Sequence, residues 1–426
     1  MEKKSAHFMC FLLCSVSLAL VVCFSGIAHA TNGYFANGYS VESKALAGAG
    51  VALPQGSLDA STNPAAMAFV GTRIDLGLSI FNPNREYKVK GNQSGAPYFG
   101  LAPGTEKSDS RWFIVPSIGA NRQLDDNNSI GISIYGNGGM NTDYDTNTFY
   151  GSSPTGVDLM QLFVVPTYAR KITSKHAIAI SPIFAYQRFE AKGLEAFSDP
   201  QYSASPDNVT NNGHDNSYGY GAKVGYMGEV LPFLNIGASY QTKIWMSKLD
   251  EYKGLFAEQG DFDIPATWTV GLALKATPEL IFLVDVQEIY YSDVKSINNP
   301  LRPNIQTSHL GRDSGAGFGW DDITILKLGL QWKSSKDWTW RAGYSYGDQP
   351  VPKSEVLFNT LAPGVIKHHA SLGVTKTMGN QELKLALVHA FSNSVTGPNT
   401  LEVPGQQRIE LKMNQWEFSV GYAWKF

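Results

Sequence analysis

Cysteine is almost absent from this chain. The three cysteines among 426 residues are Cys10, Cys14 and Cys23, all near the amino terminus. If that segment is removed on export, the remaining chain has no thiol. Disulfides, zinc–thiolate sites and cysteine nucleophiles are then excluded.

The first thirty residues have the pattern of an export signal. Lys3 and Lys4 precede an apolar run, and Ala28-His29-Ala30 fits the small-x-small pattern at which such signals are cleaved. We therefore expect a signal peptide over residues 1–30 and a mature chain from Thr31. A retained membrane anchor is the alternative, which the short apolar core and the cleavage pattern disfavour.

Charged residues and long apolar runs are also scarce. Charged residues make up 17% of the chain, against about a quarter in soluble domains. Beyond the first thirty residues no apolar run approaches the roughly eighteen residues that a spanning helix needs, which excludes a helical membrane protein. The formal net charge of −3 gives no sign of a nucleic-acid partner.

What the chain has in abundance is alternation of apolar and polar residues, the pattern of strands with two different environments. In residues 409–426, Trp416 and Phe418 share one face, and Gln415 and Glu417 share the other. A soluble sandwich would alternate too, but it would bury its large face against a second sheet. A terminal aromatic, here Phe426, is common in bacterial barrels, and we interpret it as a signal for the barrel-assembly machinery.

Fourteen such segments predict an all-β fold, a 14-stranded antiparallel transmembrane β-barrel of the bacterial outer membrane. An even number suits bacterial barrels, as do long and short connections in alternation. The barrel must close, because an open edge in hydrocarbon would leave backbone groups unpaired. The expected strands are 73–82, 111–122, 128–137, 162–172, 176–190, 217–230, 233–246, 264–276, 279–292, 322–334, 337–347, 365–378, 381–393 and 409–426.

Residues 31–72 do not alternate and are rich in small residues. Asn63 is placed to cap a helix, with Pro64 at the first helical position and Ala65 after it. The segment could hang in the periplasm or fold inside the lumen. We expect a small helical hatch over 31–72 that plugs the lumen of a barrel over 73–426, because fourteen strands leave an interior too wide for wall side chains to fill.

The sequence resembles a known family, the outer-membrane long-chain fatty-acid and hydrocarbon transporters of the FadL/TodX type. The resemblance spans the expected mature chain. It rests on Thr31-Asn32-Gly33-Tyr34, residues 44–52 (KALAGAGVA), Asn63-Pro64-Ala65, residues 135–141 (YGNGGMN), Gly319-Trp320-Asp321-Asp322, Arg341-Ala342-Gly343-Tyr344 and residues 392–399 (SNSVTGPN).

The resemblance implies a hatch-plugged barrel in which loops capture the ligand, an apolar pocket holds it, and a gap at a kinked third strand releases it sideways. Gly136, Gly138 and Gly139 end the expected third strand. Glycines weaken strand pairing and permit bends, so the local chemistry suits such a kink. A flexible loop entrance without a gap is the alternative.

Apolar side chains in two long loops are candidates for ligand capture. Leu194 and Phe197 lie in the loop over 191–216, and Leu249, Leu255 and Phe256 lie in the loop over 247–263. Packing among the loops themselves is the alternative role for all five.

Two cations are candidates for binding a carboxylate head group. Strand parity turns Lys327 and Arg341 towards the lumen from adjacent strands. Arginine would grip a carboxylate as a fork and lysine would act as a point charge. Alternatively they brace the wall by pairing with lumenal acids, namely Asp75, Asp285, Glu382 or Glu417.

No pattern for catalysis, a cofactor or a metal is present. His368 and His369 are neighbours in an expected strand and must face opposite ways, which spoils them as a metal pair. We therefore expect passive transport of hydrophobic small molecules, fatty acids or hydrocarbons, by a protein that contacts outer-membrane lipid and lipopolysaccharide. A monomer is the default. The alternative function is a general diffusion porin for small polar solutes.

Overall fold

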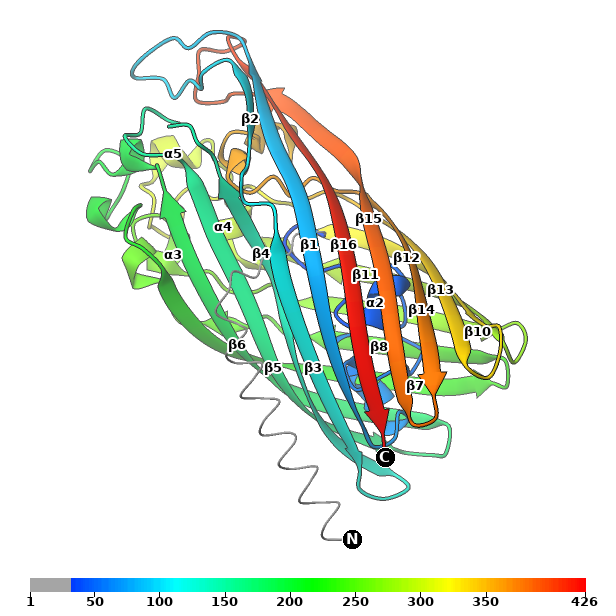
Figure 1. Ribbon diagram of the computed structural model, residues 1–426. Coiled ribbons are helices and arrows are strands. Elements are labelled where there is room, and N and C mark those ends of the chain that lie inside the picture. Colours follow the sequence, from blue (N-terminus) through cyan, green and yellow to red (C-terminus); the bar gives the residue numbers. More distant parts are fainter. Residues whose placement is uncertain (1–31) are drawn as a thin grey trace.

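The computed structural model describes residues 32–426 (Figure 1). The expected signal peptide over 1–30, and Thr31, lie outside the described residues. Sixteen strands form one sheet. They are β1 (Arg73–Lys90), β2 (Gly104–Lys107), β3 (Phe113–Gln123), β4 (Asn128–Asp143), β5 (Gly156–Lys171), β6 (His176–Lys192), β7 (Asp215–Leu231), β8 (Leu234–Gln241), β9 (Trp245–Met246), β10 (Thr267–Lys275), β11 (Leu280–Ile289), β12 (Ile323–Lys333), β13 (Trp338–Gly347), β14 (His368–Met378), β15 (Gln381–Pro398) and β16 (Arg408–Lys425).

The sheet closes into a barrel because β1 pairs with β16 along its whole length, from Arg73 opposite Lys425 to Lys90 opposite Arg408. β2 and β9 are short and pair only with β1 and β7, respectively. The wall of the described chain therefore has fourteen antiparallel strands. Closure removes the sheet edge that hydrocarbon could not satisfy. The expected fold class is confirmed.

The two faces of the wall differ as the alternation predicts. In β16, Trp416 and Phe418 are exposed on the outer face, whereas Gln415, Glu417 and Ser419 are buried on the lumenal face. Apolar side chains on the outside suit contact with lipid, and polar side chains on the inside can find partners in the lumen.

Several wall strands are longer than expected. β1 ends at Lys90 rather than at residue 82, and β15 ends at Pro398 rather than at 393. In the extension of β1, Glu86 and Lys88 lie on the outer face, whereas Tyr87 and Val89 are buried on the inner face. The alternation therefore continues, but here the polar residues face outward and apolar residues face inward. A search for outward apolar residues does not detect this part of the strand.

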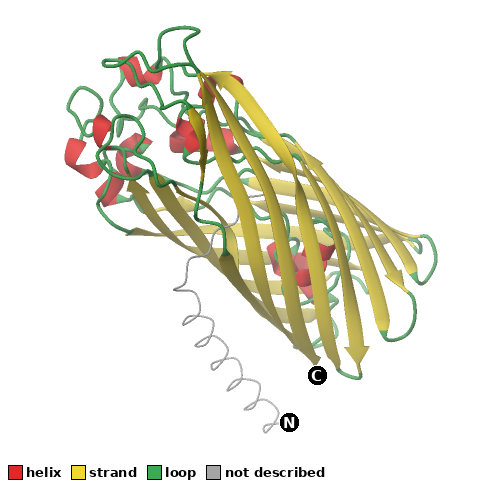
Figure 2. Cartoon of the chain, turned by 45° about the horizontal axis from the view of Figure 1, so that its top comes forward, coloured by secondary structure: helices red, strands yellow, loops and turns green. Residues whose placement is uncertain are grey.

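The long connections gather at one end of the barrel and carry short helices (Figure 2). The carboxyl terminus lies at the opposite end, with short turns (Figure 1). No helix in residues 32–426 is long and apolar enough to cross a membrane. The loop helices are η3 (Glu195–Phe197), η4 (Pro206–Asn208), η5 (Asp250–Tyr252), α3 (Ala257–Gly260), η6 (Tyr291–Asp293), α4 (Lys295–Asn298), α5 (Asn304–Thr307), η7 (Lys353–Glu355) and η8 (Phe358–Thr360).

Residues 32–72 lie inside the barrel, where Figure 1 draws them in blue. They contain α2 (Val41–Ala45), η1 (Asp59–Ser61) and η2 (Pro64–Ala68). Because α2 contacts β13 to β16 and η2 contacts β4 to β7, the segment reaches well-separated parts of the wall. The expected hatch in the lumen is confirmed, and its small residues let the backbone approach the strands closely.

Candidate functional site

The Asn63-Pro64-Ala65 motif joins the hatch to the wall. The Oδ1 atom of Asn63 accepts a hydrogen bond from the N–H of Ala65 at 3.0 Å, and Pro64 opens the helix η2. The Nδ2 atom of Asn63 donates to the carbonyl of Val51 at 2.7 Å and to the carbonyl of Tyr226, on β7, at 2.9 Å. One side chain thus caps a helix, ties two hatch segments together and seats both on the wall.

An ion-pair network holds α2 against the wall. Lys44 pairs with Glu417 of β16 at 2.6 Å, and Glu42 pairs with Lys384 of β15. Lys384 also pairs with Asp75 of β1 at 2.5 Å. All five side chains are buried. Breaking any of these pairs would leave a charge in a site that water barely reaches, which is costly.

The network continues inside the wall. Arg73 pairs with Asp75 at 2.6 Å and with Glu382 at 2.8 Å. The carboxylates of Glu42, Asp75 and Glu382 lie within 4.8 Å of one another, a spacing that could suit a metal ion. Here Arg73 and Lys384 already lie among these carboxylates and offset much of their charge. The group is therefore an ion-pair network that joins hatch and wall.

Lys327 faces the lumen as expected, and both Lys327 and Arg341 contact the hatch. The Nζ atom of Lys327 lies 3.4 Å from the carbonyl of Gly48, and the Nε atom of Arg341 donates to Gln55 at 3.0 Å. Among residues 32–426 neither cation forms an ion pair. Of the acids considered as partners, Asp75, Glu382 and Glu417 pair with other cations, so that prediction is wrong for these three.

Asp285 is the remaining acid and lies opposite Lys327 in the register of β11 and β12. Its Oδ2 atom accepts hydrogen bonds from the N–H groups of Gly50 and Val51, at 2.7 and 2.9 Å. It too contacts the hatch. The alternation of residues along each strand could predict that these charges face the lumen. It could not predict that the hatch backbone would form hydrogen bonds with them.

Four of the five apolar loop residues line one cavity. Leu194, Phe197, Leu255 and Phe256 meet there, and the cavity measures about 30 Å³. Leu249 is buried in the same apolar cluster without lining the cavity. The remaining lining residues are Val157, Phe189, Ser296, Ala316, Gly317, Phe318, Phe358 and Leu361.

The loop cavity is therefore apolar and nearly closed. Its lining residues come from strand ends and from four loops. Phe318 and Phe358 were not predicted from the sequence, because their loops have no alternation of apolar and polar residues. Phe197 stacks on Phe99 of the first long loop, with ring centroids 4.7 Å apart. A ligand larger than a water molecule could enter only if these side chains moved apart.

β4, the third strand of the wall, is irregular at the expected glycines. Its register with β5 shifts between Gly136 and Gly138. Gly138 forms a bridge with Phe35 of the hatch, and the N–H of Gly139 donates to the carbonyl of Tyr34 at 3.0 Å. A Cβ atom on Gly138 would come within 1.9 Å of that carbonyl oxygen. The contact between β4 and the hatch therefore requires glycine at this position.

A chain of side-chain hydrogen bonds holds the bulged residue, Asn137. The hydroxyl of Tyr39, in the hatch, donates to Asn137 at 3.1 Å. Asn137 donates to Gln161 of β5 at 3.0 Å, and Gln161 donates to Gln187 of β6 at 2.8 Å. The partners lie on separate strands, so no local pattern in the sequence could reveal the chain.

Aromatic residues connect the start of the hatch with the loops. The hydroxyl of Tyr291, on η6, donates to the carbonyl of Asn32 at 2.5 Å. Tyr291 lies edge-on to Tyr34 and to Trp320, with centroid distances of 5.4 and 5.0 Å. Burial raises the pKa of both Tyr34 and Tyr291 well above the usual value, so both hydroxyls stay neutral. Trp320 in turn lies beside Phe318 of the loop cavity.

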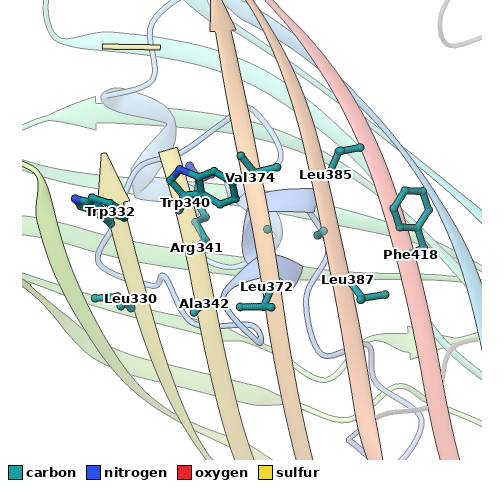
Figure 3. A pocket seen from close by; sticks show the side chains of 12 residues that line it. Leu330, Trp332, Trp340, Arg341, Ala342, Leu372, Val374, Leu385, Leu387 and Phe418 are labelled. Atoms are coloured by element: carbon teal, nitrogen blue, oxygen red, sulfur yellow. The ribbon is translucent and has the colours of Figure 1, made fainter. Parts of the chain in front are cut away.

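A second apolar hollow, of about 360 Å³, lies on the wall across β12 to β16 (Figure 3). Trp332, Trp340, Leu372 and Phe418 rim it, and all are exposed on the outer face. The small residues Ala342, Gly373 and Ala386 also line it and leave space between the larger side chains. The exposed residues of the hollow face the lipid side of the wall, and its lining also includes Arg341, which contacts Gln55 of the hatch.

Comparison with known proteins agrees with this architecture. A profile of the outer membrane protein transport protein family (OMPP1/FadL/TodX) matches residues 21–426. No curated protein sequence matches the chain. Among solved structures, the toluene transporter TodX of Pseudomonas putida has a TM-score of 0.68 at 19% identity, covering 92% of this chain and 99% of its own.

Two further structures share the fold. A Pseudomonas aeruginosa FadL homologue has a TM-score of 0.69 at 16% identity, covering 92% of this chain and all 100% of its own. The Ralstonia pickettii toluene transporter TbuX has a TM-score of 0.62 at 17% identity, covering 92% and 99%. The chain therefore belongs to the OMPP1/FadL/TodX family, and it is a transport barrel of the bacterial outer membrane rather than an enzyme.

Proposed function

We propose that this protein carries hydrophobic small molecules through the outer membrane, with hydrocarbons as the first candidate and long-chain fatty acids as the second. The loops capture the ligand, the apolar cavity beneath them holds it, and a gap beside β4 releases it sideways into outer-membrane lipid. No bond in the ligand is broken. The observation that carries the proposal is the contact of the hatch with the kink of β4.

Strand pairing supports a gap beside β4. The ladder between β3 and β4 runs from Gln123 opposite Ser129 to Ser117 opposite Tyr135, and pairing beyond that point is confined to the other side of β4. The kinked part of β4 is instead bonded to hatch residues 34–36. In this part of the wall β4 is bonded to the hatch instead of to β3. This arrangement supports a lateral opening that the hatch controls.

The character of the loop cavity supports a neutral, apolar ligand. Ser296 provides the only polar side chain among its lining residues. Lys327 and Arg341 do not line the cavity, and both contact the hatch. We propose that these two cations brace the hatch. Two solved relatives are toluene transporters, which agrees with a hydrocarbon as the first candidate.

Movement of the hatch is the proposed gating step. Residues 32–35 lie between the aromatic side chains beneath the loops and the kink of β4. Ligand that separates the loop side chains would disturb Trp320 and Tyr291, and through them Tyr34. Asn63, Pro64 and Ala65 would keep the rest of the hatch fixed on the wall during this change.

Uptake by cells that lack their own transporter tests the proposal. Cells expressing the chain would receive labelled toluene, labelled oleate or a small labelled sugar, beside cells with an empty vector. A Phe197→Ser variant removes an aromatic side chain from the cavity. Tyr98→Ser changes an exposed aromatic residue of another loop and serves as the control.

We expect saturable toluene uptake that Phe197→Ser reduces and Tyr98→Ser leaves unchanged. Saturable uptake of oleate without toluene would move the ligand class to fatty acids and return Lys327 and Arg341 to the role of head-group ligands. Sugar entry without uptake of either hydrophobic compound would overturn the proposal in favour of a diffusion porin.

A further inference from the structure

The wall has a window between β3 and β4. On one side of it, residues 113–116 of β3 pair with β1 alone. On the other side, β4 pairs with β5 on both sides of the bulged Asn137, and residues 137–139 contact the hatch. The window is closed below by the pair Ser117 and Tyr135. It is closed above by the hydroxyl of Ser110, which donates to Oδ1 of Asn141, and by the N–H of Asp109, which donates to the carbonyl of Asp143 at 2.8 Å.

Two side chains meet across this window. Val115 of β3 and Met160 of β5 form a small apolar cluster of their own, with Tyr186 of β6 packed against it. Strands β3 and β5 are not neighbours, since β4 lies between them. The residue of β4 opposite Met160 is Gly139, which has no side chain to block the contact. Side chains thus occupy a place that backbone would fill in a regular wall.

The burial of Met160 is unusual for its face of the strand. Met160 alternates with Asp158, whose carboxylate pairs with Arg188 on the outer side of β6. Met160 therefore belongs to the outward row of β5, yet it is only 2% exposed. Phe184, in the outward row of β6, is 55% exposed. Met160 is sheltered by Val115 and Tyr186, at the place where β4 is bonded to the hatch instead of to β3.

We propose that Met160 is the movable side chain that closes the lateral window, and that it turns aside to let an apolar ligand pass from the lumen into lipid. The inference rests on the proposed function, since it presumes lateral release. Methionine suits the role because its side chain is unbranched, has three rotatable bonds and packs against apolar groups of varied shape.

The neighbours of Met160 differ in how freely they can move. Val115 is branched at Cβ and has few rotamers. The hydroxyl of Tyr186 donates to Asn216 at 2.6 Å, which fixes the ring at the outer edge of the window. Met160 therefore moves between two fixed sides.

Cross-linking tests the window directly. The variant Val115→Cys/Met160→Cys places thiols on both sides, and residues 32–426 contain no other cysteine. A short bis-methanethiosulfonate reagent would join them in cells that express the full chain. The two single-cysteine variants, treated with the same reagent, are the controls. Heat-modifiable migration on a gel checks that each barrel is folded.

We expect the cross-linked variant to take up toluene and oleate at the empty-vector rate, and a reductant to restore uptake. Undiminished uptake after complete cross-linking would overturn the role of the window while leaving transport intact. Failure of the unmodified protein to take up either compound would overturn the proposed function itself and with it this inference.

Substitution provides a second, independent measurement. We expect Met160→Ala to raise the initial rate of uptake and Met160→Phe to lower it, with ligand affinity of the purified protein unchanged in both. Met378→Ala removes an exposed methionine at the end of β14 and is the matched control. Equal rates in all three variants would contradict a side-chain gate at residue 160.

Discussion

The N–H of Gly139, in a wall strand, donates to the carbonyl of Tyr34, in the hatch, at 3.0 Å. These residues are far apart in the chain and belong to the wall and to the hatch, respectively. Tyr34 also packs against Tyr291, beneath the loops. One short hatch segment therefore contacts both the proposed entrance and the proposed exit, and the following predictions depend on its contacts.

Gly138→Ala should block transport without preventing assembly of the barrel. The new Cβ atom would lie 1.9 Å from the carbonyl oxygen of Tyr34, so the hatch segment must shift. Overpacking of this kind costs about 1–3 kcal/mol. Uptake rate and gel migration would be measured together. Gly347→Ala, where a Cβ atom would meet only a side chain at 3.0 Å, should retain uptake; equal uptake by both variants would contradict the proposed role of the contact.

Asn63→Ala should loosen the hatch. The change removes the cap on Ala65 and the bonds to Val51 and Tyr226. Loss of a buried hydrogen-bonded side chain that leaves partners unsatisfied costs about 1–3 kcal/mol. Single-channel conductance in a planar bilayer should rise, because water and ions would pass a displaced hatch. Asn92→Ala, at an exposed loop position, is the control, and conductance equal to it would argue against a seating role for Asn63.

Lys384→Met should be among the most destabilising single changes at the junction of hatch and wall. It leaves Glu42 and Asp75 buried without this cation. Removing one partner of a buried ion pair costs about 3–5 kcal/mol. Thermal unfolding in detergent would measure the loss, with Lys336→Met, at an exposed turn, as the control. Partial recovery in Lys384→Met/Glu42→Gln would show that the uncompensated carboxylate causes the loss.

Asp261→Asn should stabilise the loops only at neutral pH. Burial, and then repulsion by Asp263 and Glu258, raise the pKa of Asp261 from 3.8 to about 6. The pKa of Asp261 is higher in the folded protein than in the unfolded chain, so the protonated carboxyl favours the folded state. The parent is therefore as stable as the variant below pH 4, and it loses stability relative to the variant as the pH rises through 6. The variant should therefore unfold at a higher temperature than the parent at pH 7.5 and at the same temperature at pH 3.5.

The exposed residue Asp207 provides the comparison for this pH dependence, since it lies in a neighbouring loop. Asp207→Asn should leave the unfolding temperature unchanged at both pH values. A gain for Asp261→Asn that is equally large at pH 3.5 would show that the effect comes from packing rather than from ionisation.

The candidate site was predictable only in part. The apolar loop residues were identified because a carrier of hydrophobic molecules needs apolar contacts in its outer loops, and four of them, including Phe197, line one cavity. The glycines of β4 were identified because glycine disrupts strand pairing, and the register shifts at that point. Residues such as Phe318 and Met160 were not identified, because their roles depend on contacts with residues on other loops or strands.

The sequence by itself determined the wall of the barrel and the direction of its side chains. Each strand carries the period-two pattern within about ten residues, because lipid and lumen impose different chemistry on its two faces. The tertiary structure alone decided which groups meet inside. Lys44 pairs with Glu417, and Tyr34 meets Gly139, only because closure, strand register and the path of the hatch bring distant residues together. No local pattern encodes those distances.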